Sequence, residues 1–199
     1  MIFSRLKGFS EAKVRVEQYP TEPAIAAEVL WKAYMAGEIQ EEAIADLGCG
    51  TGILGIGCLL LGSKRVFFVD IDPGALEICR SNLSWIKSEG YTIGQATLIN
   101  CPVKEFNETV DLVIQNPPFG TKVKHADKEF LEKAMNLAPL IYSFHKSESK
   151  AFIRALSSEK GFQITEYFSF DFPIKQSMKH HTKRIQRIGV GCWKLEKIS

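Results

Sequence analysis

Short apolar runs alternate with longer amphipathic stretches along most of the chain. The short runs are typical of buried strands, and the longer stretches place apolar residues at helical spacing. The strands are expected at residues 42–48, 64–70, 95–100, 110–116, 139–145, 162–172 and 187–198. The helices are expected at residues 21–39, 53–62, 73–90, 128–138 and 149–161. This order predicts an α/β fold, in which a mostly parallel, seven-stranded sheet carries helices on both faces.

Capping and turn residues support these boundaries. Thr21 is placed to cap the helix at 21–39, and Asp72 is placed to cap the helix at 73–90. No helix separates the last two strands, so they are expected to form a C-terminal antiparallel pair. The chain contains no internal repeat and no low-complexity linker, and we expect one domain over residues 1–199.

The composition limits the class of protein. At 45% hydrophobic and 24% charged residues, the chain is typical of a globular protein. The longest apolar run, residues 53–62, is far shorter than the ~20 residues that span a bilayer, and the first residues lack a signal-peptide core. We therefore expect a cytoplasmic protein without a membrane partner. The five cysteines form no CxxC pair, which argues against a disulfide framework and a zinc site, and no metal is expected.

The positive charge is concentrated near the C-terminus. Residues 172–199 contain seven Lys or Arg and one acid, a local charge of +6, whereas the whole chain carries only +2. Such a segment suits a polyanion, although a solvated surface would have a similar composition.

A glycine-rich turn follows the first predicted strand. The sequence DLGCGTG places Asp46, Gly48, Gly50 and Gly52 there. Glycines allow a backbone to approach a ligand closely and to adopt positive φ. Taken alone, the same spacing also fits an ordinary tight turn between a strand and a helix.

An acid at the end of the second predicted strand extends this pattern. Asp70 is placed to accept hydrogen bonds from the two hydroxyls of a ribose, and Ile71 is placed to pack against an adenine. No phosphate-binding lysine follows the glycines. Together, the two strand ends indicate an adenosine-containing cofactor without a phosphate cradle, and S-adenosylmethionine has that shape.

Several motifs resemble one enzyme family. DLGCGTG, VDIDPGAL and NPPF are similar to Rossmann-like class I methyltransferases that use S-adenosyl-L-methionine to methylate amines. EQYPT, NPPFGTK, YSFHK and HHTKR resemble the single-domain archaeal and eukaryotic adenine-N6 methyltransferases of ribosomal RNA. The resemblance covers nearly the whole chain and implies N6 methylation of adenine, with small-subunit ribosomal RNA as the expected substrate.

The resemblance also implies the cofactor contacts. The N-terminal segment, residues 1–40, would cover the site through Gln18 and Thr21. Asp46 and Gly48 would hold the methionine end, and Asp70 the ribose. At the position where relatives have an acid for the adenine amine, this chain has Pro102, and Asn100 is the expected substitute.

The NPPF motif explains how an amine could be methylated. The side-chain oxygen of Asn116 and the carbonyl of Pro117 can accept the two hydrogens of an adenine amine and so localise its lone pair. Pro117 and Pro118 hold the backbone extended, which fixes these directions before substrate arrives. Phe119 would stack on a flipped-out base. The alternative is a proline-rich turn with Phe119 in the core.

Other residues are candidates for substrate contacts. Tyr19 would cover the cofactor or the target base, or serve as a core aromatic residue. His145, followed by Lys146, ends a strand beside the site, where a structural role is the alternative to a catalytic one. The loop between the last two strands contains His180, His181, Lys183 and Arg184, which suit RNA phosphates and unpaired bases.

The sequence is compatible with more than one substrate, and the resemblance also implies a protein partner. The resemblance implies a small zinc-binding activator protein that adds a strand to the sheet edge at residues 95–100. Ribosomal RNA is the expected substrate, and the basic loop favours it. DNA adenine and a protein glutamine amide are alternatives with the same chemistry, and a catalytically inert cofactor-binding scaffold is the alternative that is not an enzyme.

Overall fold

The computed structural model describes residues 2–9, 20–119, 126–175 and 185–198. All its strands belong to one seven-stranded sheet with the order β3-β2-β1-β4-β5-β7-β6. They are β1 (Ala43–Leu47), β2 (Arg65–Asp70), β3 (Gln95–Asn100), β4 (Leu112–Gln115), β5 (Leu140–Lys146), β6 (Phe162–Lys175) and β7 (Ile185–Lys197). The first five are parallel, and β7 runs antiparallel to both of its neighbours. The predicted fold class is confirmed.

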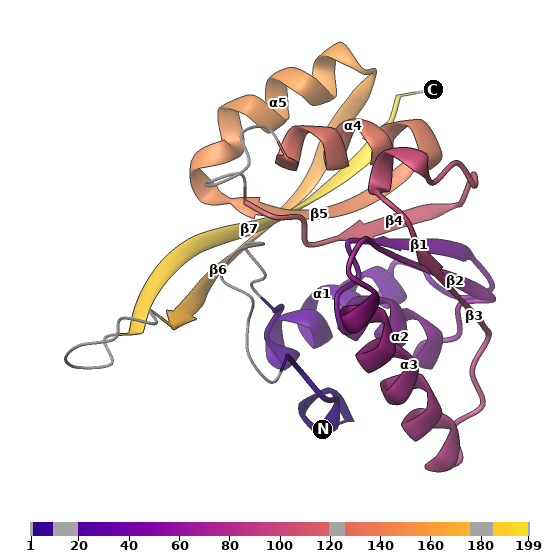
Figure 1. Cartoon of the computed structure of the whole chain (residues 1–199). Helices are drawn as coiled ribbons and strands as arrows, with labels where there is room; N and C mark the ends of the chain where they lie inside the picture. Colours follow the sequence, from indigo (N-terminus) through magenta and orange to yellow (C-terminus); the bar gives the residue numbers. More distant parts are fainter. Residues whose placement is uncertain (1, 10–19, 120–125, 176–184, 199) are drawn as a thin grey trace.

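Helices cover both faces of this sheet (Figure 1). They are α1 (Pro23–Met35), α2 (Ile53–Leu60), α3 (Pro73–Ser88), α4 (Ala126–Leu137) and α5 (Lys150–Glu159), with short 3₁₀ turns η1 (Ile2–Arg5), η3 (Val103–Glu105) and η4 (Ser147–Ser149). On one face, α1, α2 and α3 pack on the sheet, and on the other face lie α4 and α5. In the described part of the chain, no helix is long and apolar enough to cross a membrane.

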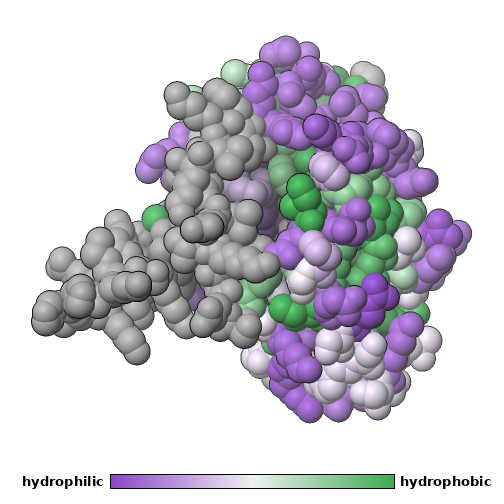
Figure 2. Space-filling view, in the orientation of Figure 1, coloured by the Kyte–Doolittle hydropathy of each residue, from purple (hydrophilic) through white to green (hydrophobic). Residues whose placement is uncertain are grey.

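Alternating strand residues build the two layers of the core. Ile44 and Phe68 point toward α1, α2 and α3, whereas Ala45 and Phe67 point toward α4 and α5. Alternation of this kind is what the pleat of a strand dictates, and it explains why strands covered on both faces are apolar throughout. On the face seen in Figure 2, hydrophobic side chains gather around the middle of the coloured surface, and polar ones lie mainly around them.

The C-terminal strand pair has an order that the sequence does not indicate. The antiparallel pair forms as expected, but β7 lies inside the sheet, between β5 and β6, and β6 forms the edge. Trp193 and Leu195 of β7 are fully buried. Both strands of the pair are longer than predicted toward the connecting loop and extend beyond the rest of the molecule (Figure 1).

The starts of α3 and α1 differ in how they are capped. Asp72 caps α3 as expected, because its Oδ1 accepts a hydrogen bond from the Gly74 amide at 2.8 Å. The prediction that Thr21 caps the first helix is wrong, because that helix begins at Pro23 with Glu22 in the capping position and no side-chain cap. Thr21 is instead buried and bonded to a residue far along the chain, as described below.

Candidate active site

The candidate site lies where β1, β2 and β4 end. Leu47 at the end of β1 pairs with Val69 of β2 and with Gln115 of β4. The residues that follow these three are Gly48 at the start of the glycine turn, Asp70 at the end of β2 and Asn116 at the start of the NPPF motif. They are therefore held at the same edge of the sheet. Ligands of open α/β sheets bind at this edge, beyond the carboxyl ends of the strands.

The glycine turn follows a left-handed path. Gly48, Gly50 and Gly52 have φ values of 66°, 54° and 87°. At Gly52 a side chain is excluded twice, by this φ and because its Cβ would lie 2.5 Å from the Cys79 sulfur. The Gly48 amide donates to the Val69 carbonyl at 2.8 Å, which ties the turn to β2.

Asp46 lies beneath the turn rather than at its surface. Its side chain is 1% exposed, and Oδ2 accepts a hydrogen bond from the Gly55 amide at 2.8 Å, in the first turn of α2. Burial raises the pKa of Asp46 to about 7, against the lowering effect of that hydrogen bond. In this structure Asp46 joins β1 to α2, and its contact with a cofactor remains a prediction.

Asp70 links the turn to the residues that follow β2. One carboxylate oxygen accepts from the Gly50 amide at 2.8 Å, and the other accepts from the Asp72 amide at 2.8 Å. Burial raises the pKa of Asp70, and these two backbone bonds oppose that rise. Ile71, the next residue, is 65% exposed. A carboxylate and an exposed apolar side chain thus stand side by side at this edge.

Asn100 supports this pair from β3. Its side-chain amide donates to the Asp70 carbonyl at 3.0 Å and to the Ile71 carbonyl at 3.1 Å. Both donor hydrogens are therefore used for the backbone beside the site. The structure assigns Asn100 a positioning contact, and its predicted contact with an adenine is not tested by this arrangement.

Asn116 is held by the N-terminal part of the chain. Its Nδ2 donates to the Thr21 hydroxyl at 3.0 Å, across 95 positions of sequence. Thr21 is 5% exposed and immediately precedes the residues that begin α1. This bond directs the Nδ2 end of the amide toward Thr21 and leaves Oδ1, which is buried, at the other end.

The remaining NPPF residues lie in or next to the core layer between the sheet and helices α1, α2 and α3. Pro117 is buried and Pro118 half-buried. Phe119 is 6% exposed and belongs to the cluster that includes residues of α1 and α2. The structure thus places Phe119 in the core, which was the alternative to a stacking role. To stack on a base, the ring would have to leave this position.

A buried polar chain beneath Asn116 was not expected from the sequence. Gln115 Nε2 donates to Ser143 Oγ at 2.9 Å, and Ser143 Oγ lies 2.6 Å from His145 Nε2. All three side chains are at most 1% exposed, and burial lowers the pKa of His145 to about 3. His145 is thus a neutral hydrogen-bonding residue, in line with its structural interpretation. The signal in the sequence that could have indicated this polar chain is the presence of polar residues inside two otherwise apolar strands, Gln115 in β4 and Ser143 and His145 in β5.

Some predicted contacts lie outside the residues that the structure describes. Among them are two predicted cofactor or substrate contacts of the N-terminal segment and the basic residues of the last loop. These are Gln18, Tyr19, His180, His181, Lys183 and Arg184. Lys146 is described and half-buried at the end of β5, one residue beyond the polar chain.

The chain is similar to a known protein family, and a relative and two solved structures illustrate the similarity. The methyltransferase small domain family matches residues 23–139. METTL5 of Danio rerio, an rRNA N(6)-adenosine-methyltransferase, is 33% identical over 187 residues, which cover 90% of this chain and 88% of that protein. PH1948 of Pyrococcus horikoshii, provisionally assigned as an RNA methyltransferase, has a crystal structure with a TM-score of 0.88 and 41% identity, covering 99% of this chain and 96% of that one. Magnesium protoporphyrin IX methyltransferase of Synechocystis PCC 6803, solved with bound SAM, shares the fold at a TM-score of 0.67 and 16% identity, covering 98% of this chain and 89% of that one.

Proposed function

Because this chain belongs to the methyltransferase small domain family, we propose that it transfers a methyl group from S-adenosylmethionine to N6 of adenosine in ribosomal RNA. The resemblance inferred from the motifs is confirmed at the level of the family. The observation that carries the proposal is the alignment of Asn116 with Asp70 and the glycine turn at one sheet edge. Asp70 and Asn116 follow the two strands that flank β1, and this arrangement supports a nucleoside-binding role for the carboxylate and an amine-orienting role for the amide.

The residues at the end of β2 fit an adenosine. The carboxylate oxygens of Asp70 accept backbone hydrogen bonds from the Gly50 and Asp72 amides at 2.8 Å, and an ionised carboxylate offers about four acceptor positions, so acceptor capacity is left for ribose hydroxyls. The exposed side chain of Ile71 offers apolar surface to an adenine, and Asn100 holds the backbone of both residues. When bound, S-adenosylmethionine supplies a methyl group activated by a sulfonium.

Asn116 and Pro117 would orient the amine. The Asn116 amide is fixed by Thr21, so Oδ1 is the acceptor that it presents to one amine hydrogen, and the Pro117 carbonyl accepts the other. Holding both hydrogens directs the nitrogen lone pair away from the purine ring and toward the incoming methyl group. The nitrogen would take the methyl group from the sulfonium, whose C–S bond breaks to leave S-adenosylhomocysteine, and would then release one proton to solvent, so no buried general base is needed. For the base to stack on Phe119, the ring would have to move out of the cluster that covers it.

Ribosomal RNA is the substrate that the relatives favour. METTL5 of Danio rerio acts on rRNA adenosine, and the C-terminal segment of this chain is basic. We further propose small-subunit rRNA as the target, a cytoplasmic location, and an activator protein that pairs with β3. In support of the last point, β3 lies at an edge of the sheet with half-buried side chains, and such an edge can accept an added strand.

Methyl transfer from labelled cofactor into stripped ribosomal RNA, with nucleoside analysis, tests the proposed activity. We expect label in N6-methyladenosine of the small-subunit RNA. Parallel reactions with DNA and with protein cover the alternatives: label in protein glutamine, in DNA alone, or in none of these substrates would refute the proposal, and each result identifies the alternative that replaces it. Adding the activator tests the partner in the same assay.

Two variants separate the proposed roles at the site. Asn116→Ala should reduce transfer about 100-fold or more while the affinity for S-adenosylhomocysteine changes little, since the amide orients only the substrate amine. Asp70→Ala should weaken binding of the same ligand, measured by calorimetry. If both variants lose ligand affinity equally, the roles assigned to Asn116 and Asp70 are wrong.

A further inference from the structure

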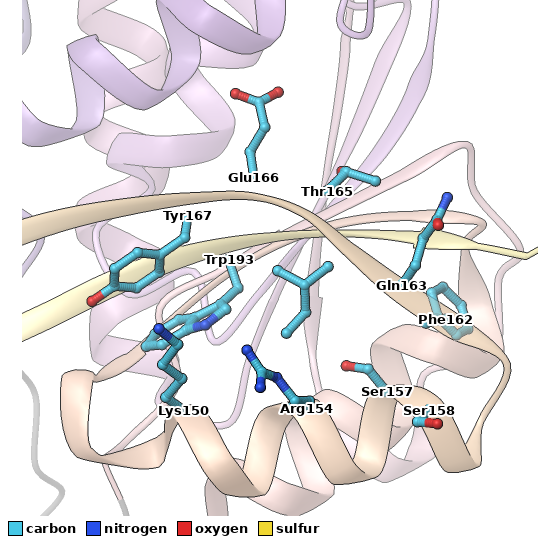
Figure 3. Close-up of a pocket in the computed structure, with 11 residues that line it drawn as sticks. Lys150, Arg154, Ser157, Ser158, Phe162, Gln163, Thr165, Glu166, Tyr167 and Trp193 are labelled. Carbon is cyan, nitrogen blue, oxygen red and sulfur yellow. The ribbon is translucent and has the colours of Figure 1, made fainter.

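A groove outside the candidate site runs between helix α5 and the edge strand β6. We call it the α5–β6 groove (Figure 3), and its volume is about 440 Å³. On its helix side, each side chain lies three or four positions from at least one of the others, so they line one side of α5. They are Lys150, Arg154, Ser157 and Ser158. The strand side includes Tyr167, and Trp193 of β7 forms part of the lining.

The groove carries positive charge that is not neutralised nearby. Lys150 and Arg154 are both exposed, and within the described ranges no carboxylate forms an ion pair with either of them. Glu166 is the one acid in the lining, but it points away from the helix side chains (Figure 3). Its carboxylate lies 3.4 Å from the Lys194 ammonium. The groove therefore suits an anion.

An aromatic ring borders the two cations. Tyr167 is 39% exposed, its ring centroid lies 4.8 Å from that of Trp193, and its hydroxyl donates to Ser147 Oγ at 3.4 Å. The Lys150 ammonium lies 5.8 Å from the Tyr167 ring centroid. Trp193 and Ser147 thus hold a ring whose exposed part is available for stacking. A cationic surface next to an aromatic platform is typical of proteins that bind single-stranded nucleic acid.

Ser157 provides an independent indication of a ligand. This residue is 2% exposed, and its hydroxyl has no hydrogen-bond partner among the described residues. Figure 3 shows the hydroxyl on the side of α5 that faces the strands. An unsatisfied buried hydroxyl is unfavourable, so a polar atom placed at the inner end of the groove would be stabilised there.

The groove connects to the candidate site. The ring of Trp193 lies edge-on to that of His145, with centroids 5.8 Å apart, and His145 belongs to the polar chain that ends at Gln115. Gln115 immediately precedes Asn116. These contacts are interior ones, and the route at the surface follows from the sheet instead. β5 pairs in parallel with β4, so Ser147 and Lys150, which follow β5, lie at the same sheet edge as Asn116, and an RNA strand with one adenosine at Asn116 would reach the groove past the end of β5.

We propose that the α5–β6 groove binds the single-stranded segment of substrate RNA that flanks the target adenosine. Lys150 and Arg154 contact its phosphates, and an unpaired base stacks on Tyr167. This inference rests on the proposed function, because the RNA is the substrate of the same site. The volume lies at the lower end of that of small-ligand sites, about 300–1,000 Å³, which suits one or two nucleotides rather than a duplex.

Binding of a fluorescent single-stranded RNA to the full chain, measured by anisotropy over a range of salt concentrations, tests the groove. The charge-removing double variant Lys150→Gln/Arg154→Gln should bind about tenfold more weakly, and its salt dependence should fall by a slope of about 1.4, the value for two phosphate contacts on a single strand. The matched control is Arg80→Gln/Lys87→Gln, which removes the same charge from exposed positions of α3 on the other face of the sheet. Equal effects of the two double variants on RNA binding would refute the proposal that the groove binds RNA.

The aromatic contact is tested separately. Tyr167→Leu should weaken RNA binding at least about fivefold through lost stacking, whereas Tyr167→Phe, which keeps the ring, should bind like the wild type. Thermal unfolding of each variant identifies any loss of folding, and if Tyr167→Leu is unfolded, the Tyr167→Phe and double variants decide. Weak binding by Tyr167→Phe would overturn the stacking role.

Two further outcomes separate the groove from the proposed function. If the wild-type chain methylates rRNA and the groove variants bind and methylate it normally, the groove fails and the proposed function stands. If the wild-type chain neither binds nor methylates RNA, both fail. If polyglutamate binds the wild type but not Lys150→Gln/Arg154→Gln, while RNA binds both proteins equally, the groove binds an acidic peptide and the RNA proposal is overturned.

Discussion

The buried imidazole of His145 leads to a quantitative prediction about stability. Its pKa is lowered from 6.5 to about 3 because the ring is removed from water, so the folded protein keeps His145 neutral. In the unfolded chain, the same residue takes up a proton below pH 6.5. The unfolded state therefore binds more protons between pH 6.5 and 3, and stability is lost as the pH falls through this window.

The size of the effect follows from the two pKa values. At pH 7.5 the unfolded histidine is almost entirely neutral, so its protonation lowers the free energy of unfolding by only about 0.1 kcal/mol. At pH 5 the unfolded histidine is almost fully protonated, and the reduction is about 2 kcal/mol. Because pH 5 lies well above the folded pKa, this figure depends mainly on the unfolded value.

His145→Gln removes the titration and retains an amide that can bond to Ser143. Urea unfolding, followed by tryptophan fluorescence, gives the free energy of unfolding of both proteins at pH 7.5 and 5. We expect the wild type to lose about 2 kcal/mol relative to His145→Gln between these two values. The comparison is needed because Asp46 acts in the opposite sense: its folded pKa of about 7 makes the folded state bind more protons as the pH falls, which adds stability in both proteins.

Ser143→Ala serves as the control. It removes the hydrogen bond at 2.6 Å but leaves the histidine, so its stability should be lower than that of the wild type while the pH dependence is retained. If the free energies of the wild type and His145→Gln change in parallel between pH 7.5 and 5, His145 titrates normally in the folded protein and the argument is wrong.

Three other substitutions test separate parts of the structure. Lys194→Met should destabilise the fold by about 3 kcal/mol in urea unfolding, because the ammonium, in a side chain 8% exposed, lies 2.6 Å from the Glu38 carboxylate, and a loss below about 1 kcal/mol would contradict this. Gly191→Ala should cost about 1–3 kcal/mol, since the added Cβ would overlap the Tyr167 ring, and an unchanged urea midpoint would disprove the close packing. Ile71→Asn should reduce the affinity for S-adenosylhomocysteine about tenfold without changing the melting temperature, because the side chain is 65% exposed, and unchanged affinity would remove Ile71 from the adenine site.

Much of the sheet could be predicted from the sequence because its signals are local. Each parallel strand is an apolar run bounded by turn residues, and the DLGCGTG turn is a contiguous glycine pattern. The parallel order then aligns the strand ends, so the neighbourhood of Asp70 and Asn116 follows from topology alone. The edge of the sheet that carries the candidate site can therefore be predicted from the sequence alone.

Contacts between distant parts of the chain could not be predicted in the same way. The residues around Thr21 fit a helix start that this residue would cap. Only the tertiary fold shows that its hydroxyl accepts a hydrogen bond from Asn116, 95 positions away. Likewise, the apolar pattern of β7 is the same whether it lies at the edge or inside the sheet. Pairing with β5 decides its place, and this pairing depends on the burial of Trp193 against both neighbours.

The position of β7 also sets the order in which the sheet can be completed during synthesis. β7 is made after every other strand, yet it lies between β5 and β6, and it is the sheet neighbour through which β6 joins the rest. The five parallel strands can pair while the ribosome still holds residues 185–197, but until then β5 exposes a hydrophobic strand edge of the kind that recruits other chains. A nascent chain that stalls before position 185 therefore cannot close its sheet, and we expect it to be recovered with chaperones or in aggregates rather than as a shortened folded protein.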